Sequence, residues 1–284
     1  MEFKYNWDWG ILLCTVEDTE TGCIGPYFYW IVEGFGWTIA VASAAWVIAF
    51  SLGSIIGVLR TFEKPMLWVV PYIRSPIHFQ THVIAASKGV ITIDIGWFLH
   101  GFATLYVTIF RNVPLLVQLF LWYFVFPELV SEEMGKWLKR DLPLPEFWTS
   151  VLCMGLYTAA RVAEQVRAGV NSISQGQHYA AKAIGLTQIQ VYRYVLLPVA
   201  YRIIIPPLTS DFLGVFKNSS LALTIGVLEL TAMTRQIEEY SYQGFEAFTV
   251  ATVLYIVVTA IVMAAMSVVE RRFAMPGMIS LGEK

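Results

Sequence analysis

Long apolar stretches separated by short polar loops dominate the chain. Two of them, Trp37 to Leu59 and Ala247 to Val269, each run for 23 residues without a charged side chain. A helix needs about 20 apolar residues to cross the hydrocarbon core of a bilayer. Both stretches therefore predict transmembrane helices.

Three further stretches have the length of a span but carry polar interruptions: Leu105 to Phe126, Phe147 to Val166 and Val199 to Leu228. Hydrophobic residues make up 57% of the 284 residues and charged residues only 14%. A soluble domain of this size would need more charge to cover its surface. The sequence predicts an all-α integral membrane protein with about five transmembrane helices.

Positive charge is distributed unevenly among the loops. One set of alternate loops holds twelve Lys and Arg residues, whereas the other set holds five, together with most of the acidic residues. Lys and Arg are retained on the cytoplasmic side. We expect an extracytoplasmic N-terminal segment at 1–32 without a cleaved signal, a transmembrane domain at 33–270 and a cytoplasmic tail at 271–284. The acidic outer loops, including Glu229 and Glu246, are a possible docking surface.

The segment at 65–104 departs from this scheme. Its apolar runs, Met66 to Ile73 and Val90 to Phe98, are too short to span and are interrupted by charges. We interpret the segment as an interfacial one on the cytoplasmic side, with a sixth span or a re-entrant hairpin as the alternative. His78 and His82 have the spacing of two metal ligands but lack a third, so no metal site is predicted.

The loop at 167–198 contains no acidic residue and has the pattern of a small folded unit. Good helix formers run from Gln177 to Ile184 and stop at Gly185, which is suited to a helix C-cap. Thr187 can cap a second short helix that runs to Pro198. Two short helices that meet at a glycine would form a protruding knob, suited to a cleft in another protein.

This loop resembles the signature cytoplasmic loop of type I ABC importer permeases, which reads Glu-Ala-Ala, three residues, Gly, nine residues and Ile-x-Leu-Pro. Tyr179 replaces the acidic first residue of that signature, and the remaining positions match in spacing. The resemblance implies a set of residues that couple the chain to an ATPase: Tyr179, Ala180, Ala181, Gly185, Leu197 and Pro198.

Further motifs are similar to those of the polar amino acid permeases, and most of all to the glutamate/aspartate type. They are Phe110 to Gln118, Tyr157 to Arg161, Glu164 to Arg167, Lys217 to Leu221, Trp7 to Gly10 and Val269 to Arg272. The resemblance covers most of the chain except 65–104, where the family has a shorter connection. It implies the type I importer permease fold, the bacterial cytoplasmic membrane, and a polar amino acid such as glutamate or aspartate as cargo.

Charged residues inside the predicted spans are candidates for substrate contact. Exposing a charge to lipid costs roughly 2.5 to 3.5 kcal/mol on insertion scales, so Arg111, Asp211 and Lys217 should each face a cavity or a partner. Arg111 could instead reach the cytoplasmic interface by snorkelling. Asp211 and Lys217 lie about 120° apart around a helix, so each should find its partner on another helix. The substrate-pathway candidates are Arg111, Asn112, Gln118, Asp211, Lys217, Asn218 and Ser219.

Two adjacent prolines, Pro206 and Pro207, precede Asp211 in the fourth span. Proline removes a helix hydrogen bond and crowds the preceding turn. We expect the prolines to kink or interrupt this span, which is tolerable only where protein or water covers the freed carbonyl groups.

No G-x-x-x-x-G-K-[ST] sequence occurs in the chain, so we expect no bound cofactor and ATP use by a separate subunit. The resemblance implies alternating access driven by a cytosolic ABC ATPase dimer that grips the loop at 167–198. It also implies a second permease subunit, identical or related, and an extracytoplasmic solute-binding protein. The net charge of -2 gives no indication of nucleic acid. The alternatives are an ion-coupled carrier or channel and, with no H-E-x-x-H or G-x-S-x-G sequence to support it, an intramembrane enzyme.

Overall fold

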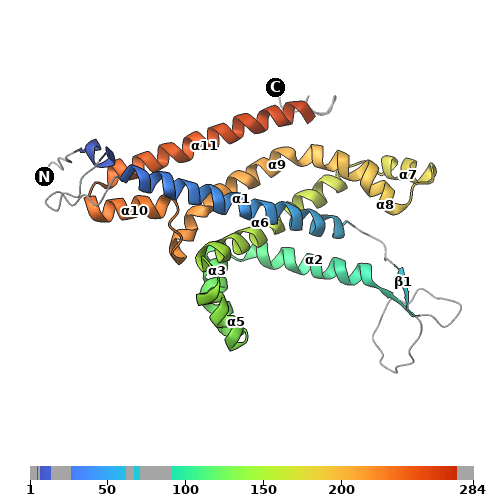
Figure 1. Ribbon diagram of the computed structural model, residues 1–284. Helices are drawn as coiled ribbons and strands as arrows, with labels where there is room; N and C mark the ends of the chain where they lie inside the picture. Colours follow the sequence, from blue (N-terminus) through green and yellow to red (C-terminus); the bar gives the residue numbers. More distant parts are fainter. Residues whose placement is uncertain (1–4, 6, 14–26, 62–66, 71–90, 274–284) are drawn as a thin grey trace.

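The computed structural model describes residues 5, 7–13, 27–61, 67–70 and 91–273, which form an elongated bundle of helices (Figure 1). Its long helices are α1 (Tyr27–Leu59), α2 (Ile95–Asn112), α6 (Pro145–Asn171), α9 (Leu197–Asn218) and α11 (Gly244–Phe273). They run roughly along one direction, as the spans of a membrane protein do. The predicted helical membrane fold is confirmed.

Three helical stretches are long and apolar enough to cross a bilayer: Tyr27–Leu59, Gln188–Ile225 and Gly244–Phe273. A fourth crossing, if a bent pair counts as one span, consists of Phe98–Asn112 and Leu115–Leu129, which meet at an angle of 106°. The expected third span corresponds to α6, which is 27 residues long but too polar to meet the same criterion. Its neighbours α1, α2 and α9 pack around it. The charged residues in the second half of α6 instead lie on the side that these helices leave uncovered.

Two glycines of α1 allow it to pack closely against α6. A Cβ atom on Gly53 would lie 2.7 Å from the carbonyl oxygen of Ala159, and one on Gly57 would lie 2.7 Å from that of Ala163. Both distances are too short for real atoms. The Gly-xxx-Gly spacing therefore provides a flat strip on which the α6 backbone rests, as is common between membrane helices.

The second span begins earlier than predicted and is bent. The helix α2 starts at Ile95, so residues 95–104 of the expected interfacial segment are helical and continue into the span. Ahead of it, β1 (Leu67–Val70) and β2 (Ile91–Asp94) pair antiparallel. Residues 71–90, with His78 and His82, lie outside the described residues, and with them most of the segment for which an interfacial position, a sixth span or a re-entrant hairpin was considered.

At Pro114 the chain leaves the direction of α2. The next elements are α3 (Leu115–Phe120), a π-helical turn η2 (Leu121–Val125) and α4 (Phe126–Leu129), followed by α5 (Glu132–Lys136) and a second π-helical turn η3 (Trp137–Asp141). Proline cannot donate to the preceding turn, which explains the break. Leu105 to Phe126 is therefore not one straight helix.

The fourth span is not interrupted at its prolines. The helix α9 runs through Pro206 and Pro207 and changes to a 3-10 turn, η5 (Ser219–Ile225), only after Asn218. Close to the prolines, the Thr209 hydroxyl donates to the carbonyl oxygen of Ile205 at 3.0 Å. The expected interruption thus lies at the far end of the helix, directly after Lys217 and Asn218.

Acidic residues expected on the outer surface are partly used inside the fold. The buried carboxylate of Glu229 caps α10 (Leu230–Ser241) by accepting from the backbone N–H groups of Thr231 and Ala232 at 3.0 and 2.8 Å. Buried Glu246 accepts from the backbone N–H of Asp8 at 2.7 Å, just before the short helix η1 (Trp9–Leu13). These two carboxylates hold the outer end together and are not available to a docking partner.

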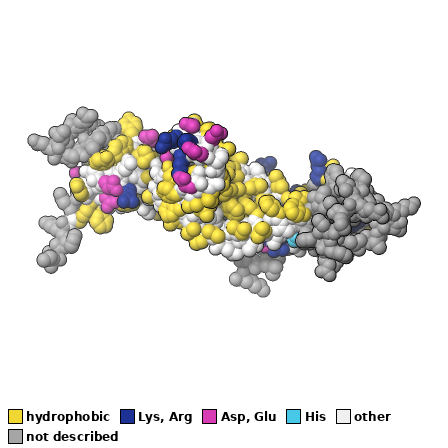
Figure 2. All heavy atoms as spheres, turned by 90° about the horizontal axis from the view of Figure 1, so that it is seen from below, with side chains coloured by type: hydrophobic (Ala, Val, Ile, Leu, Met, Phe, Trp, Pro, Cys, Tyr) yellow, Lys and Arg dark blue, Asp and Glu magenta, His cyan; other side chains and the backbone are white. Residues whose placement is uncertain are grey.

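Seen from below, the molecule is covered mainly by hydrophobic side chains, with one prominent patch of mixed charge (Figure 2). The patch lies where the arm formed by α4, α5 and η3 projects. Ion pairs of the arm join Lys136 to Glu132 and Lys139 to Glu128. An apolar belt next to a charged projection is the surface expected of a protein that spans a bilayer and emerges from it.

Candidate coupling surface and substrate pathway

The loop at 167–198 folds into the predicted helical unit. The helix α7 (Gln175–Ala183) ends in a Schellman motif, in which the Leu186 N–H donates to the Ala181 carbonyl at 3.3 Å and the Gly185 N–H donates to that of Lys182 at 3.0 Å. Gly185 has a φ of +88°, which favours glycine. Thr187 caps the next helix, α8 (Gln188–Val191), in a capping box with Gln190. The predicted C-cap and N-cap are confirmed.

The second short helix is not separate from the fourth span. A π-helical turn, η4 (Tyr192–Leu196), joins α8 directly to α9, so Leu197 and Pro198 lie in the first turn of that span. Pro198 has no N–H to donate to the preceding turn, and that turn is the π-helical one. The unit is therefore rigidly connected to the helix that carries Asp211 and Lys217.

Large side chains of this unit point outward. Its exposed apolar and aromatic residues are Tyr179, Ile184, Ile189 and Tyr194, of which Ile184 is 78% exposed. Ala180 is exposed as well, whereas Ala181 is buried against Val191 and Leu196. We call these four large residues the coupling knob. An apolar surface of this kind at the end of a bundle indicates a protein partner.

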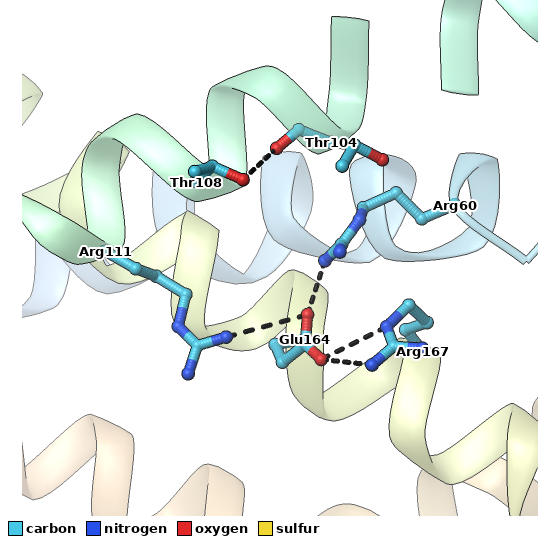
Figure 3. Close-up of polar contacts among 6 residues, drawn as sticks. All are labelled: Arg60, Thr104, Thr108, Arg111, Glu164 and Arg167. Carbon is cyan, nitrogen blue, oxygen red and sulfur yellow. Dashed lines mark hydrogen bonds and ion pairs between the residues drawn. The ribbon is translucent and has the colours of Figure 1, made fainter. Parts of the chain in front are cut away.

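A cluster of one carboxylate and three guanidinium groups lies where α1, α2 and α6 meet (Figure 3). Glu164 of α6 pairs with Arg60 at 2.5 Å (Nη1 to Oε2), with Arg167 through Nε at 3.1 Å, and with Arg111 at 3.7 Å. Arg60 is mostly buried, whereas 48% of the Arg111 side chain is exposed. The cluster carries two more positive than negative charges, and Arg111 is its most loosely held member.

Gln118 differs from the other candidates at this bend. Its side-chain amide donates to the carbonyl oxygens of Phe110 and Val113 at 3.0 and 2.9 Å, and the residue is buried. Phe110 lies in the last turn of α2 and Val113 directly follows it; Pro114, four residues after Phe110, has no N–H to donate to the Phe110 carbonyl. Gln118 stabilises the bend, whereas neighbouring Asn112 is exposed.

Asp211 has the interhelical partner that the sequence predicted. Its Oδ1 accepts from Arg161 Nε of α6 at 2.8 Å, and its side chain is 2% exposed. Its other oxygen, Oδ2, is buried without a hydrogen-bond partner among the described residues. Half of the Arg161 side chain remains exposed.

Lys217 lies elsewhere, at the end of α9. It borders an open groove of about 600 Å³ whose other polar lining residues are Ser220, Thr231, Thr252, Tyr255 and Thr259. In the part of the chain that the structure describes, no acidic side chain pairs with Lys217. Asn218 is half-buried, and Ser219 is fully buried with its hydroxyl bonded to the Phe216 carbonyl at 2.7 Å. Of these residues, Lys217 is the one that faces the groove.

The structure brings forward three residues that were not candidates from the sequence: Arg60, Arg161 and Glu164. Arg60 follows directly after the first span, and Arg161 and Glu164 lie near the expected end of the third span. Charged residues are common at the cytoplasmic ends of spans, so none of the three indicated a functional role. Their spacing on α6 could have indicated more, because Arg161 and Glu164 lie three residues apart and share one side of the helix. Among the described residues, no group of three metal-ligating side chains occurs.

Comparison with known proteins establishes the class. Residues 83–275 match the family described as "Binding-protein-dependent transport system inner membrane component". The chain belongs to this family: it is an inner membrane permease subunit of an ABC importer for amino acids.

The glutamate/aspartate import permease protein GltJ of Escherichia coli K12 is 43% identical to this chain, over 96% of the chain and 97% of GltJ. The probable amino-acid permease protein YxeN of Bacillus subtilis is 35% identical over 63% of this chain and 76% of its own. A solved amino acid ABC transporter with histidines has a TM-score of 0.64 at 25% identity, covering 87% of this chain and 95% of its own. The predicted importer permease fold is confirmed.

Proposed function

We propose that this permease carries acidic amino acids, glutamate and aspartate, and that a cytosolic ABC ATPase drives it by gripping the coupling knob. The observation that carries the cargo assignment is a local excess of positive charge at two places, the Glu164 cluster and Lys217. One carboxylate is shared by three arginines at the Glu164 cluster, and Lys217 stands in a groove without a carboxylate from the described chain.

A positive excess of this kind favours an anionic cargo. A cleft lined by charges of one sign raises the local concentration of ions of the opposite sign. A cationic amino acid would be repelled by the same groups. The name of the relative in Escherichia coli, an import permease for glutamate and aspartate, supports the same choice.

The coupling assignment follows from the position of the knob. Ile184 and Ile189 project from a short helical pair that is continuous with α9, so a push on the knob would be transmitted along the helix that carries Asp211 and Lys217. ATP is used by the partner subunit, and a second permease together with an extracytoplasmic binding protein completes the transporter. The exposed face of α11, whose buried residues are confined to its first turns, is available to lipid or to the second permease.

Uptake competition tests the cargo. Proteoliposomes that contain this chain, its ATPase and its binding protein are expected to take up labelled glutamate, with inhibition by aspartate and none by arginine or glutamine. Uptake that arginine suppresses and aspartate does not would contradict the assignment.

Co-purification tests the coupling. Ile184→Asp or Ile189→Asp should release the ATPase from the detergent-solubilised permease, because a charge on an apolar docking residue must be desolvated. Leu129→Asp is the matched control, since Leu129 is 75% exposed and lies in α4, on the arm that Figure 1 shows away from α7 and α8. If both knob variants retained the ATPase, the proposed contact between the ATPase and the coupling knob would be wrong.

A further inference from the structure

The second half of α6 has one open side. From Thr158 to Asn171 all residues are buried except six, which fall on an arc of about 160° around the helix. These six are Arg161, Glu164, Gln165, Arg167, Ala168 and Asn171. Five of the six are polar or charged. The other sides of this half of α6 are covered by α1, α2 and α9. Among the described residues, this side is therefore the part of the helix that can contact water, substrate or another protein.

This side of α6 does not face lipid. Arg161 and Glu164 stand on a span, and charges directed at hydrocarbon are costly, so residues of this kind face a water-filled path or a protein partner. Near the cytoplasmic end the side carries the Glu164 cluster, whose carboxylate is already occupied by Arg60 and Arg167. Arg161, one turn earlier, is the residue that offers an exposed charge there.

Asp211 of α9 holds Arg161 in place through an ion pair. Asp211 is 2% exposed, lies near the middle of the helical stretch Gln188–Ile225, and accepts from Nε of Arg161 at 2.8 Å. Its second oxygen has no partner among the described residues, so the interactions of this carboxylate are directed at Arg161 alone. The Nε edge of the guanidinium is thereby fixed to α9, while half of the side chain stays exposed.

We infer that Arg161 is the residue that recognises the side-chain carboxylate of the transported amino acid, and that Asp211 positions it. A guanidinium has five N–H donors, of which one on Nε is used by Asp211 and one further hydrogen bond goes to Tyr157, so Nη donors remain for a contact with a carboxylate. Such a contact also discriminates, because an amide or an aliphatic side chain offers no anionic acceptor to the remaining Nη donors. This inference rests on the proposed function, since it assigns a substrate contact within an importer of acidic amino acids.

The experiment measures glutamate uptake and binding-protein-stimulated ATP hydrolysis in the same proteoliposomes. Arg161→Gln is expected to lower uptake on the order of tenfold or more, as the loss of a charged hydrogen bond does. ATP hydrolysis should stay within about twofold of the parent, because the coupling knob is untouched. Arg161→Lys should rescue only part of the uptake, since an ammonium group lacks the two-pronged geometry.

Asp211→Asn should lower uptake as Arg161→Gln does, although it removes a negative charge and not a positive one. The reason is that the Arg161 guanidinium loses the carboxylate that positions it. Arg140→Gln is the control, as Arg140 is exposed on the outer arm; it should match the parent. Undiminished uptake by Arg161→Gln would overturn the inference. A parallel fall of uptake and ATP hydrolysis, or loss of the assembled complex in size-exclusion chromatography, would also overturn it by showing that Arg161 has a structural role.

The outcomes separate the two proposals. If the parent transporter carries glutamate and Arg161→Gln does so equally well, only the inference about Arg161 fails. If the parent carries neutral or basic amino acids and neither acidic one, the proposed function fails.

Discussion

Arg60 and Glu164 form an ion pair of 2.5 Å, from Nη1 to Oε2, that fastens the residue following α1 to the side of α6. Arg60 Nε is buried and has no hydrogen-bond partner among the described residues, so its guanidinium depends strongly on this carboxylate. The pair also fixes one of the three arginines whose charges set the potential inside the bundle. Its loss should therefore affect stability as well as transport.

Glu164→Gln should lower the thermal unfolding midpoint of the purified protein and reduce uptake, because three guanidinium groups would lose their shared anion. The expected cost is about 1 to 3 kcal/mol. Glu132→Gln is the control, since Glu132 is 83% exposed and pairs with Lys136 one turn away; such exposed pairs contribute little. Equal midpoints for the two variants would show that the Glu164 cluster does not stabilise the fold.

The close contact of α1 with α6 can be tested with two glycines of the same helix. Gly53→Ala should destabilise by about 1 to 3 kcal/mol, because its Cβ would lie 2.7 Å from the Ala159 carbonyl oxygen and from the Val162 Cβ. Gly36→Ala is the matched control, because no atom lies within 4 Å of the Cβ it would add. Thermal melts in detergent should separate the variants. A Gly53→Ala protein as stable as Gly36→Ala would mean that the two helices are not this close.

Much of the architecture follows from hydrophobic pattern and charge, because span length and the distribution of Lys and Arg depend on local composition. The caps at Gly185 and Thr187 were predictable for the same reason, since each depends on a few neighbouring residues. The Schellman bond from Leu186 to Ala181 needs no contact from elsewhere in the chain.

Long-range contacts explain what the sequence did not reveal. The sequence did not indicate that α2 starts at Ile95, because the polar residues of an amphipathic helix lower its mean hydropathy. Pro206 and Pro207 do not interrupt α9, and packing of the helix against α6 and α1 compensates for the lost hydrogen bonds. The role of Glu246 depends on Asp8, 238 residues away in the chain, beyond the reach of any local pattern. Glu229, in contrast, caps its own helix through Thr231 and Ala232, and a local pattern could have indicated this.

The bend at Pro114 offers a test of Gln118. Gln118→Met keeps the volume but removes the amide that donates to the Phe110 and Val113 carbonyls. Leaving these two half-buried acceptors without the amide should cost about 1 kcal/mol, measured as a lower unfolding midpoint. Asn112→Met, at an exposed neighbouring position, should leave the midpoint unchanged. If the two variants melt together, Gln118 does not stabilise the bend.

Gly185→Ala tests the shape of the coupling knob without adding a clash. Neither Gly185 nor Gly176 has an atom within 4 Å of an added Cβ, but Gly185 alone of the two has a positive φ. The substitution should cost about 1 kcal/mol or more locally, displace Ile184 and Leu186, and lower the uptake achieved per ATP hydrolysed. Gly176→Ala should behave like the parent. Full coupling in Gly185→Ala, and also after the harsher change Ala181→Asp, would argue against this loop as the ATPase contact.

The most direct test of the account is accumulation of labelled glutamate in proteoliposomes that hold this permease with its ATPase and binding protein. We predict that glutamate accumulates against its gradient only when ATP reaches the ATPase and the binding protein is present on the opposite side. Accumulation without ATP, driven by a sodium or proton gradient, would contradict the account and identify the chain as part of an ion-coupled carrier.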